Sequence, residues 1–164
     1  MKILYVIIMM LFLGMVSCSE DNLKGYSSSN CIQFDKLSKD STVFSFAYDE
    51  TLESGTVALK LVMISPLVDR DRKYNVKFLQ DESSAQAGVD FEMPAEEQVI
   101  AANDSVAYLN VIVKRNKALK GSAIAVFEVQ VSDDFMPGIE ANRKGRIFIT
   151  NQLTRPGWWN DWHE

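Results

Sequence analysis

The chain has 164 residues, a length typical of one domain, and its 22 acidic side chains outnumber the 17 basic ones. The resulting net charge of −5 offers no electrostatic drive toward nucleic acid, which requires clustered Lys and Arg. The only histidine is His163, next to the last residue, and the only cysteines are Cys18 and Cys31. A histidine-dependent catalytic triad and the common zinc sites, which need several His or Cys ligands, are therefore close to excluded.

The N-terminal segment has the pattern of a secretory signal, because Lys2 is followed by an apolar run over residues 3–16 and then by small residues. This run of about 14 residues is shorter than the roughly 20 that cross a bilayer. Met15-Val16-Ser17-Cys18 resembles a bacterial lipobox in which methionine replaces the usual leucine. The resemblance implies cleavage before Cys18 and attachment of lipid chains, palmitate among them, to this cysteine. The alternative is an ordinary cysteine of a signal peptide.

The signal peptide is thus predicted over residues 1–17, and residues 18–30 form an acidic, serine-rich and flexible tether without an apolar period. Several acyl chains together hold a protein stably at a membrane. Ser19-Glu20-Asp21 resembles the acidic tag with which Bacteroidetes lipoproteins are displayed on the cell surface. We therefore expect a lipid-anchored protein on the outer face of the outer membrane. The alternative interpretation of the tag is a solvated acidic linker.

Beyond the tether, apolar and polar residues alternate with the period of half-buried β-strands. The alternating segments are 44–48, 57–63, 74–78, 109–113, 125–131 and 146–149. Glycine-containing turns separate them, the four prolines lie outside them, and no segment shows a helical period. This pattern predicts an all-β sandwich over residues 31–152, followed by a Trp-rich tail over residues 153–164. The strands that begin near Val106 and Ile124 are partly apolar on both faces, which favours central positions.

From Tyr74 to Val131 the order of features resembles a Calx-beta repeat. A strand is followed by the stretch Ser84–Phe91, where small residues, a turn glycine, an aspartate and an aromatic coincide. A short strand at Val99-Ile100 and a pair of long strands come next. A closer resemblance covers nearly the whole mature chain and is to the Bacteroidetes lipoproteins called domain of unknown function 4843. The residues that carry it are Cys31–Phe34, Thr42–Asp49, Gly88–Phe91, Lys114–Asn116 and Leu153–Trp159.

This resemblance implies an immunoglobulin-like, Calx-beta-like β-sandwich and a surface lipoprotein without an assigned activity, often encoded near glycan-uptake or adhesion loci. Members usually continue past the Pro-x-Trp-Trp stretch, whereas this sequence stops at Glu164. Either it is a short member, or its end was lost to a frameshift.

Some Calx-beta domains bind calcium through acidic loops, so the loop aspartates are candidate ligands. They are Asp81, Asp90, Asp104, Asp133 and Asp134. Calcium requires six to eight oxygen ligands, and the acidic stretch expected after the long strand is replaced here by Lys114-Arg115-Asn116-Lys117. We therefore expect no metal and no cofactor, and we expect Asp90 to cap a turn instead.

Trp158, Trp159 and Trp162 form the only tryptophan cluster of the chain, with polar neighbours. Aromatic faces beside polar groups are what a sugar-binding platform requires. The alternative is that these rings pack on the end of the domain. Cys31 is expected to be a small buried apolar residue, with an intermolecular disulfide or a reactive thiol as alternatives.

Together these features predict a non-enzymatic binding or accessory module that is anchored in the outer membrane and binds a glycan. A glycosidase requires two carboxylates across a cleft, but the acidic residues lie in turns and on outward strand faces, where solvated charge is usual. The alternative is a structural or adhesive protein that assembles with another outer-membrane protein, for which an edge strand of the sandwich is a suitable contact.

Overall fold

The computed structural model describes residues 30–36 and 42–153, which form two β-sheets without an α-helix in these ranges. The strands are β1 (Cys31–Phe34), β2 (Thr42–Ser45), β3 (Ser54–Ile64), β4 (Arg72–Phe78), β5 (Glu97–Ile100), β6 (Val106–Lys114), β7 (Ser122–Gln130), β8 (Met136–Pro137) and β9 (Lys144–Thr150). Three single-turn 3-10 helices are η1 (Phe46–Tyr48), η2 (Gln80–Glu82) and η3 (Glu140–Asn142). No helix in the described part of the chain is long and apolar enough to cross a membrane.

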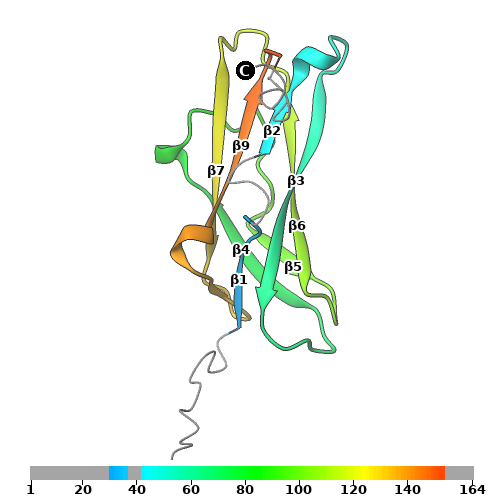
Figure 1. Cartoon of the computed structure of the whole chain (residues 1–164), viewed down its shortest axis with the longest axis vertical. Helices are drawn as coiled ribbons and strands as arrows, with labels where there is room; N and C mark the ends of the chain where they lie inside the picture. Colours follow the sequence, from blue (N-terminus) through cyan, green and yellow to red (C-terminus); the bar gives the residue numbers. More distant parts are fainter. Residues whose placement is uncertain (1–29, 37–41, 154–164) are drawn as a thin grey trace, which may run out of the picture.

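The four-stranded sheet has the order β6-β3-β1-β8, and the five-stranded sheet has the order β2-β9-β7-β4-β5. Neighbouring strands are antiparallel except for the pairs β1–β8 and β2–β9. The first two strands therefore join different sheets. The body is elongated, with β1 beginning at one end and β9 ending at the other (Figure 1).

The end of the body where β1 begins is called the β1 end and is formed by the loops 65–71, 101–105 and 131–135. The opposite end is called the β9 end and is formed by the segments 46–53, 115–121 and 151–153. Both are capped by the connections between strands.

The core lies between the sheets and follows the period-two pattern of the sequence. In β6, Ala107, Leu109, Val111 and Val113 are buried, while the residues between them point away from the core. The same alternation occurs in β3 and β4. The prediction of an all-β sandwich is therefore confirmed.

The predicted central position is confirmed for β7 but is wrong for β6, which lies at the edge of the four-stranded sheet. The apolar side chains that suggested burial on both faces are Tyr108 and Ile112. They lie on the outer face and are 54% and 40% exposed. Apolar residues on the solvent side of an edge strand have the same sequence pattern as a central strand.

The predicted strand over 44–48 ends at Ser45, because Phe46–Tyr48 form η1. The Ser45 hydroxyl accepts a hydrogen bond from the N–H of Ala47 and so caps this turn. Phe46 is nevertheless buried, as the alternation predicted. Cys31 is half-buried rather than buried.

The Calx-beta-like stretch, Ser84–Phe91, packs against the hydrophobic core. Ala85 and Phe91 are fully buried, and Gly88 has a positive φ of 83° that favours glycine. Asp90 accepts hydrogen bonds from the N–H of Gln86 and from the amide of Asn116, both at 2.8 Å, so the expected turn-capping role is confirmed. The Phe91 ring then stacks edge-on within a cluster of aromatic rings.

An almost completely buried arginine, Arg72, holds the β1 end together and is 1% exposed. It donates to the Ser65 hydroxyl at 2.8 Å and to the carbonyls of Pro66 and Asp104 at 3.4 Å. Its guanidinium lies 4.9 Å from the centre of the Phe135 ring. Burial lowers the pKa of Arg72, but an arginine remains protonated at any physiological pH.

A second arginine, Arg115, holds the β9 end together. Its Nε donates to the carbonyl of Leu52 at 2.6 Å, and its Nη2 donates to the carbonyls of Phe46 and Asp49. The guanidinium lies 5.0 Å from the centre of the Phe46 ring. Each end is thus closed by a cation that stacks on a buried phenylalanine and donates to backbone carbonyls.

Gly145 in β9 provides a first prediction, because a Cβ there would lie 2.9 Å from the ring of the buried Phe34. We expect Gly145→Ala to lower the free energy of unfolding by about 1–3 kcal/mol in urea denaturation, since a ring inside a packed core cannot move aside. The matched control is Gly55→Ala, where the ring of Phe44 is approached even more closely but is only half-buried and can turn outward. Equal losses for the two variants would contradict this explanation.

Candidate functional site

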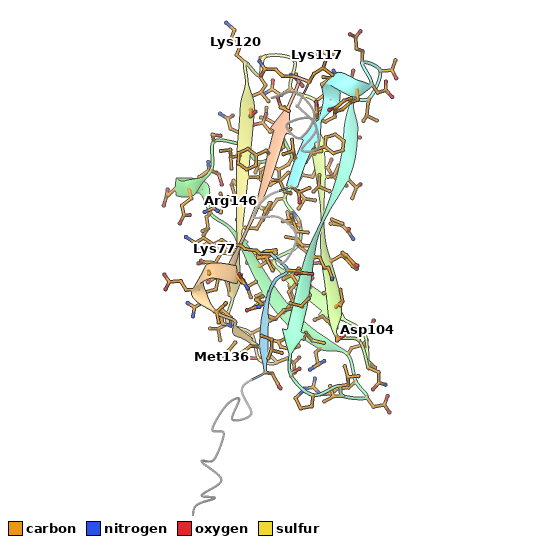
Figure 2. The ribbon with its side chains drawn as sticks, in the orientation of Figure 1. Lys77, Asp104, Lys117, Lys120, Met136 and Arg146 are labelled. Carbon is orange, nitrogen blue, oxygen red and sulfur yellow. The ribbon has the colours of Figure 1, made fainter. Side chains whose placement is uncertain are left out.

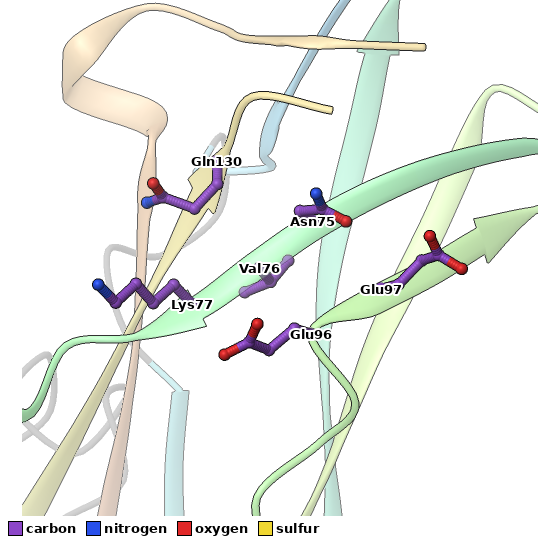
Figure 3. A pocket seen from close by; sticks show the side chains of 6 residues that line it. All are labelled: Asn75, Val76, Lys77, Glu96, Glu97 and Gln130. Atoms are coloured by element: carbon purple, nitrogen blue, oxygen red, sulfur yellow. The ribbon is translucent and has the colours of Figure 1, made fainter. Parts of the chain in front are cut away.

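A shallow hollow lies over β4, on the outer face of the five-stranded sheet. A depression of about 350 Å³ is lined by Asn75, Val76, Lys77, Glu96, Glu97 and Gln130 (Figure 3). A second depression of about 210 Å³ shares Asn75 and Glu97 with it. The other residues that line the second depression are Lys73, Val131, Ser132 and Asp133. We call the two together the β4 groove.

The alternation of β4 explains why polar side chains gather there. Tyr74 and Val76 point into the core, so Lys73, Asn75 and Lys77 must point outward. Burial raises the pKa of Tyr74 to about 12, which keeps its phenol neutral beneath the groove.

The strand register then sets the neighbours of Asn75 across the sheet. It lies opposite Gln130 of β7 on one side and opposite Glu97 of β5 on the other. Three strands thus supply one polar row.

The groups in this row are partly engaged with one another. Asn75 donates to the carbonyl of Val131 at 3.4 Å, and Gln130 donates to a carboxylate oxygen of Glu128 at 2.9 Å. Among the described residues, the amide oxygens of Asn75 and Gln130 accept no hydrogen bond. Because Asn75 and Gln130 are directly opposite each other in neighbouring strands, their oxygens are available to a ligand as adjacent hydrogen-bond acceptors.

One ion pair borders the groove, with 2.9 Å between Lys73 Nζ and Glu97 Oε1. The hydrogen bond to Glu97 raises the pKa of Lys73. Both side chains are more than half exposed, so the pair contributes little to stability and can open for a ligand. The groove thus offers hydrogen-bond donors and acceptors to a hydroxyl-rich molecule, because side-chain amides, a carboxylate and an amine lie next to one another in it. No aromatic ring lines the groove.

The aspartates considered as calcium ligands are not brought together. In the described ranges, no group of three His, Cys, Asp or Glu residues is placed to hold a metal ion. Asp90 is buried in its turn, and Asp134 is bound by Arg70. The carbonyls of the β9 end that face inward are bound by the guanidinium of Arg115, which would repel a divalent ion.

The other predicted site residues are Cys18, Trp158, Trp159 and Trp162, and all four lie outside the described residues. Lipid attachment and the tryptophan platform therefore stay predictions. The residues of the β4 groove were missed as a set, apart from Asp133. Polar residues on the outward face of a strand are ordinary, and the register that joins β4, β5 and β7 is not visible in the sequence.

Comparison with known proteins places the chain in a family. Residues 24–164 match the family described as Domain of unknown function (DUF4843), and the chain belongs to that family. No curated protein matches it. The family resemblance found from the motifs is therefore confirmed.

Solved structures support the fold. The apo form of the Calx CBD1 domain is similar with a TM-score of 0.56 at 9% identity, over 76% of this chain and 99% of that domain. A candidate carbohydrate-binding protein from Bacteroides ovatus is similar with a TM-score of 0.50 at 12% identity, over 75% of this chain and 37% of that protein. A two-domain protein of unknown function from Bacteroides fragilis is similar with a TM-score of 0.51 at 7% identity, over 76% of this chain and 46% of that protein.

These identities are low, so the similarities establish a Calx-beta-like sandwich and no shared activity. This chain spans less than half of either Bacteroides protein.

The ion pair at the β1 end gives a pH-dependent prediction. A hydrogen bond from Arg70, and another from the N–H of Lys73 at 2.8 Å, hold the pKa of Asp134 below its usual range. Such a carboxylate stabilises the fold above its unfolded pKa of about 3.9, and this contribution is lost as the pH falls through the folded value. We expect Asp134→Asn to be less stable than the natural protein near neutral pH, and the difference to shrink below about pH 4, in urea denaturation.

The matched control is Asp133→Asn. Its carboxylate is exposed and makes no hydrogen bond in the described part of the chain. It should show no such pH-dependent difference. A stability difference for Asp134→Asn that stayed constant into the acid range would contradict the role given to Arg70.

Proposed function

We propose that this protein is a non-enzymatic binding module, held on the outer face of the outer membrane by lipid on Cys18, and that it binds glycans. The observation that carries the proposal is the polar row of the β4 groove, where the amides of Asn75 and Gln130 lie side by side in the strand register. Planar amides beside charged groups suit sugar hydroxyls, which are donors and acceptors at once.

The position of the first strand supports the anchor. β1 starts at the β1 end, so a chain that arrives from a lipidated Cys18 would meet the domain there. The 12 residues between Cys18 and Cys31 reach at most about 40 Å. The β4 groove extends along the side of the body from the β1 end, where Val131, Ser132 and Asp133 line it, to Lys77, so a membrane at the β1 end would leave its far part open to ligands. Lys77 is labelled at mid-height in Figure 2, well above Met136 at the β1 end.

The carboxylates of the groove favour binding over hydrolysis. Glu96 and Glu97 are both exposed to water, and Glu97 is paired with Lys73. A glycosidase acid needs a raised pKa, which burial in an apolar pocket usually provides. The surroundings of these two residues offer no such pocket.

A second candidate function is assembly with another outer-membrane protein in a structural or adhesive role. It is favoured by the edge strand β6, which carries exposed apolar side chains. Glycan affinity supports the first function, and sugar-independent pull-down with a surface protein supports the second.

The anchor is tested by Cys18→Ser. We expect the natural protein to be recovered with membranes and to carry acyl chains on Cys18 in mass spectrometry. The variant should accumulate unprocessed or appear in the soluble fraction, because no thiol remains to be acylated. Cys31→Ser is the matched control and should fractionate like the natural protein. Identical trimming and membrane retention of Cys18→Ser would overturn the anchor.

Glycan binding is tested by retention on a panel of immobilised glycans. Loss of one hydrogen-bonding amide is expected to weaken binding about tenfold, so Asn75→Ala and Gln130→Ala should each reduce retention. Thr56→Ala, on the outer face of the other sheet, should not. If instead Trp158→Ala and Trp159→Ala abolish retention while the groove variants do not, the tryptophan tail is the platform. No retention of the natural protein on any glycan would contradict this function.

A further inference from the structure

The outer edge of β6 is partly unpaired. The N–H of Met63 in β3 donates to the carbonyl of Ser105, which directly precedes β6. In the antiparallel register of β3 and β6, the odd-numbered residues of β6 therefore direct their backbone N–H and C=O groups toward β3. The even-numbered residues therefore point to the free side. There the carbonyl of Ile112 and the N–H of Lys114 are bonded to the segment 90–92.

Between Val106 and Asn110, the β6 edge has no partner strand in the described part of the chain. The backbone groups of Tyr108 and Asn110 form no hydrogen bond there, and those of Val106 have none on this side. The stretch 106–110 thus presents a row of donors and acceptors that an additional strand could use.

The other three edges are protected in ways that β6 is not. β8 has two residues, one of them Pro137, and β2 has four. β5 also has four residues, and its Glu97 is held in an ion pair with Lys73. Short strands, prolines and charges are the usual means of preventing edge pairing. β6 has nine residues, and neither charge nor proline occurs between Val106 and Val113.

The free stretch is complementary to itself. If Tyr108 lies on a two-fold axis and faces its own copy, Val106 lies opposite Asn110 of the other copy, and no like charges meet. The three residue pairs would exchange about six backbone hydrogen bonds. The nearest charge on the same face is Lys60, which is opposite Tyr108 in the register and is paired with Asp35 at 2.7 Å.

The side chains on the outer face add an apolar contact. Tyr108 is 54% exposed, and its ring would stack beside the same ring of the second copy. Ile112 is the next outward residue along the strand. Such an interface is small, so association would be reversible and would require high local concentration.

We infer that two copies of this chain pair antiparallel through the β6 edge around Tyr108, which joins their four-stranded sheets into one continuous sheet. The inference needs neither a glycan nor the lipid anchor and so goes beyond the proposed function.

The first test is the mass of the full chain by light scattering in mild detergent, with the detergent contribution subtracted. We expect the natural protein to shift from monomer to dimer as its concentration rises. Tyr108→Lys places two like-charged residues directly opposite each other across the axis, with Cα atoms about 5.5 Å apart, and should raise the dissociation constant at least tenfold. Thr56→Lys adds the same charge to the same face, one strand away from the edge, and should dimerise like the natural protein.

The second test fixes the register through an engineered disulfide. Facing residues of an antiparallel pair have Cα atoms about 5.5 Å apart, which a disulfide can bridge. In a Cys31→Ser background, Tyr108→Cys should form a covalent dimer on oxidation in membranes, while Ala58→Cys, one strand further in, should not. A monomeric mass at every concentration would overturn the inference. So would cross-linking that is equal at positions 108 and 58.

Discussion

The architecture depends on two internal cations, Arg72 at one end of the sandwich and Arg115 at the other. Each guanidinium stacks on a buried phenylalanine. Arg72 donates to carbonyls of the two loops 65–71 and 101–105, and Arg115 donates to carbonyls of the segment 46–53. A β-sandwich leaves the carbonyls of its end loops without ladder partners, and a planar donor fork can satisfy several of them at once. The ends are therefore held by Arg72 of β4 and by Arg115, which directly follows β6.

This arrangement determines where a ligand can bind. In the described part of the chain, the loops at both ends are tied to guanidinium groups, and acidic residues such as Asp90 and Asp134 are engaged by protein donors. Polar groups also remain available on the outer faces of the sheets. The β4 groove on one face and the β6 edge of the other sheet are thus separate surfaces, so a ligand and a second protein could be bound at the same time.

The all-β class, the buried faces of the strands and the capping role of Asp90 could be predicted from the sequence, because period-two alternation and a turn motif are local signals. The position of β6 could not, since exposed Tyr108 and Ile112 look in sequence like residues buried on a second face. The groove residues were not predictable as a set, because Asn75 and Gln130 become neighbours only through the register of β4 and β7. The positive charge at Lys114–Asn116 indicated from the sequence that calcium is disfavoured there. The contacts of Arg115 with inward-facing carbonyls were not predictable, because they depend on tertiary structure.

The way β1 enters the fold has a mechanical consequence. The strand runs along the long axis of the body and is paired on both sides, with β3 and with β8. For a domain pulled by its N-terminal tether while a bound partner resists, the force would act parallel to β1. All the hydrogen bonds between β1 and β3 would then be loaded together in shear rather than opened one after another. A four-residue strand in that geometry resists tension better than its length suggests.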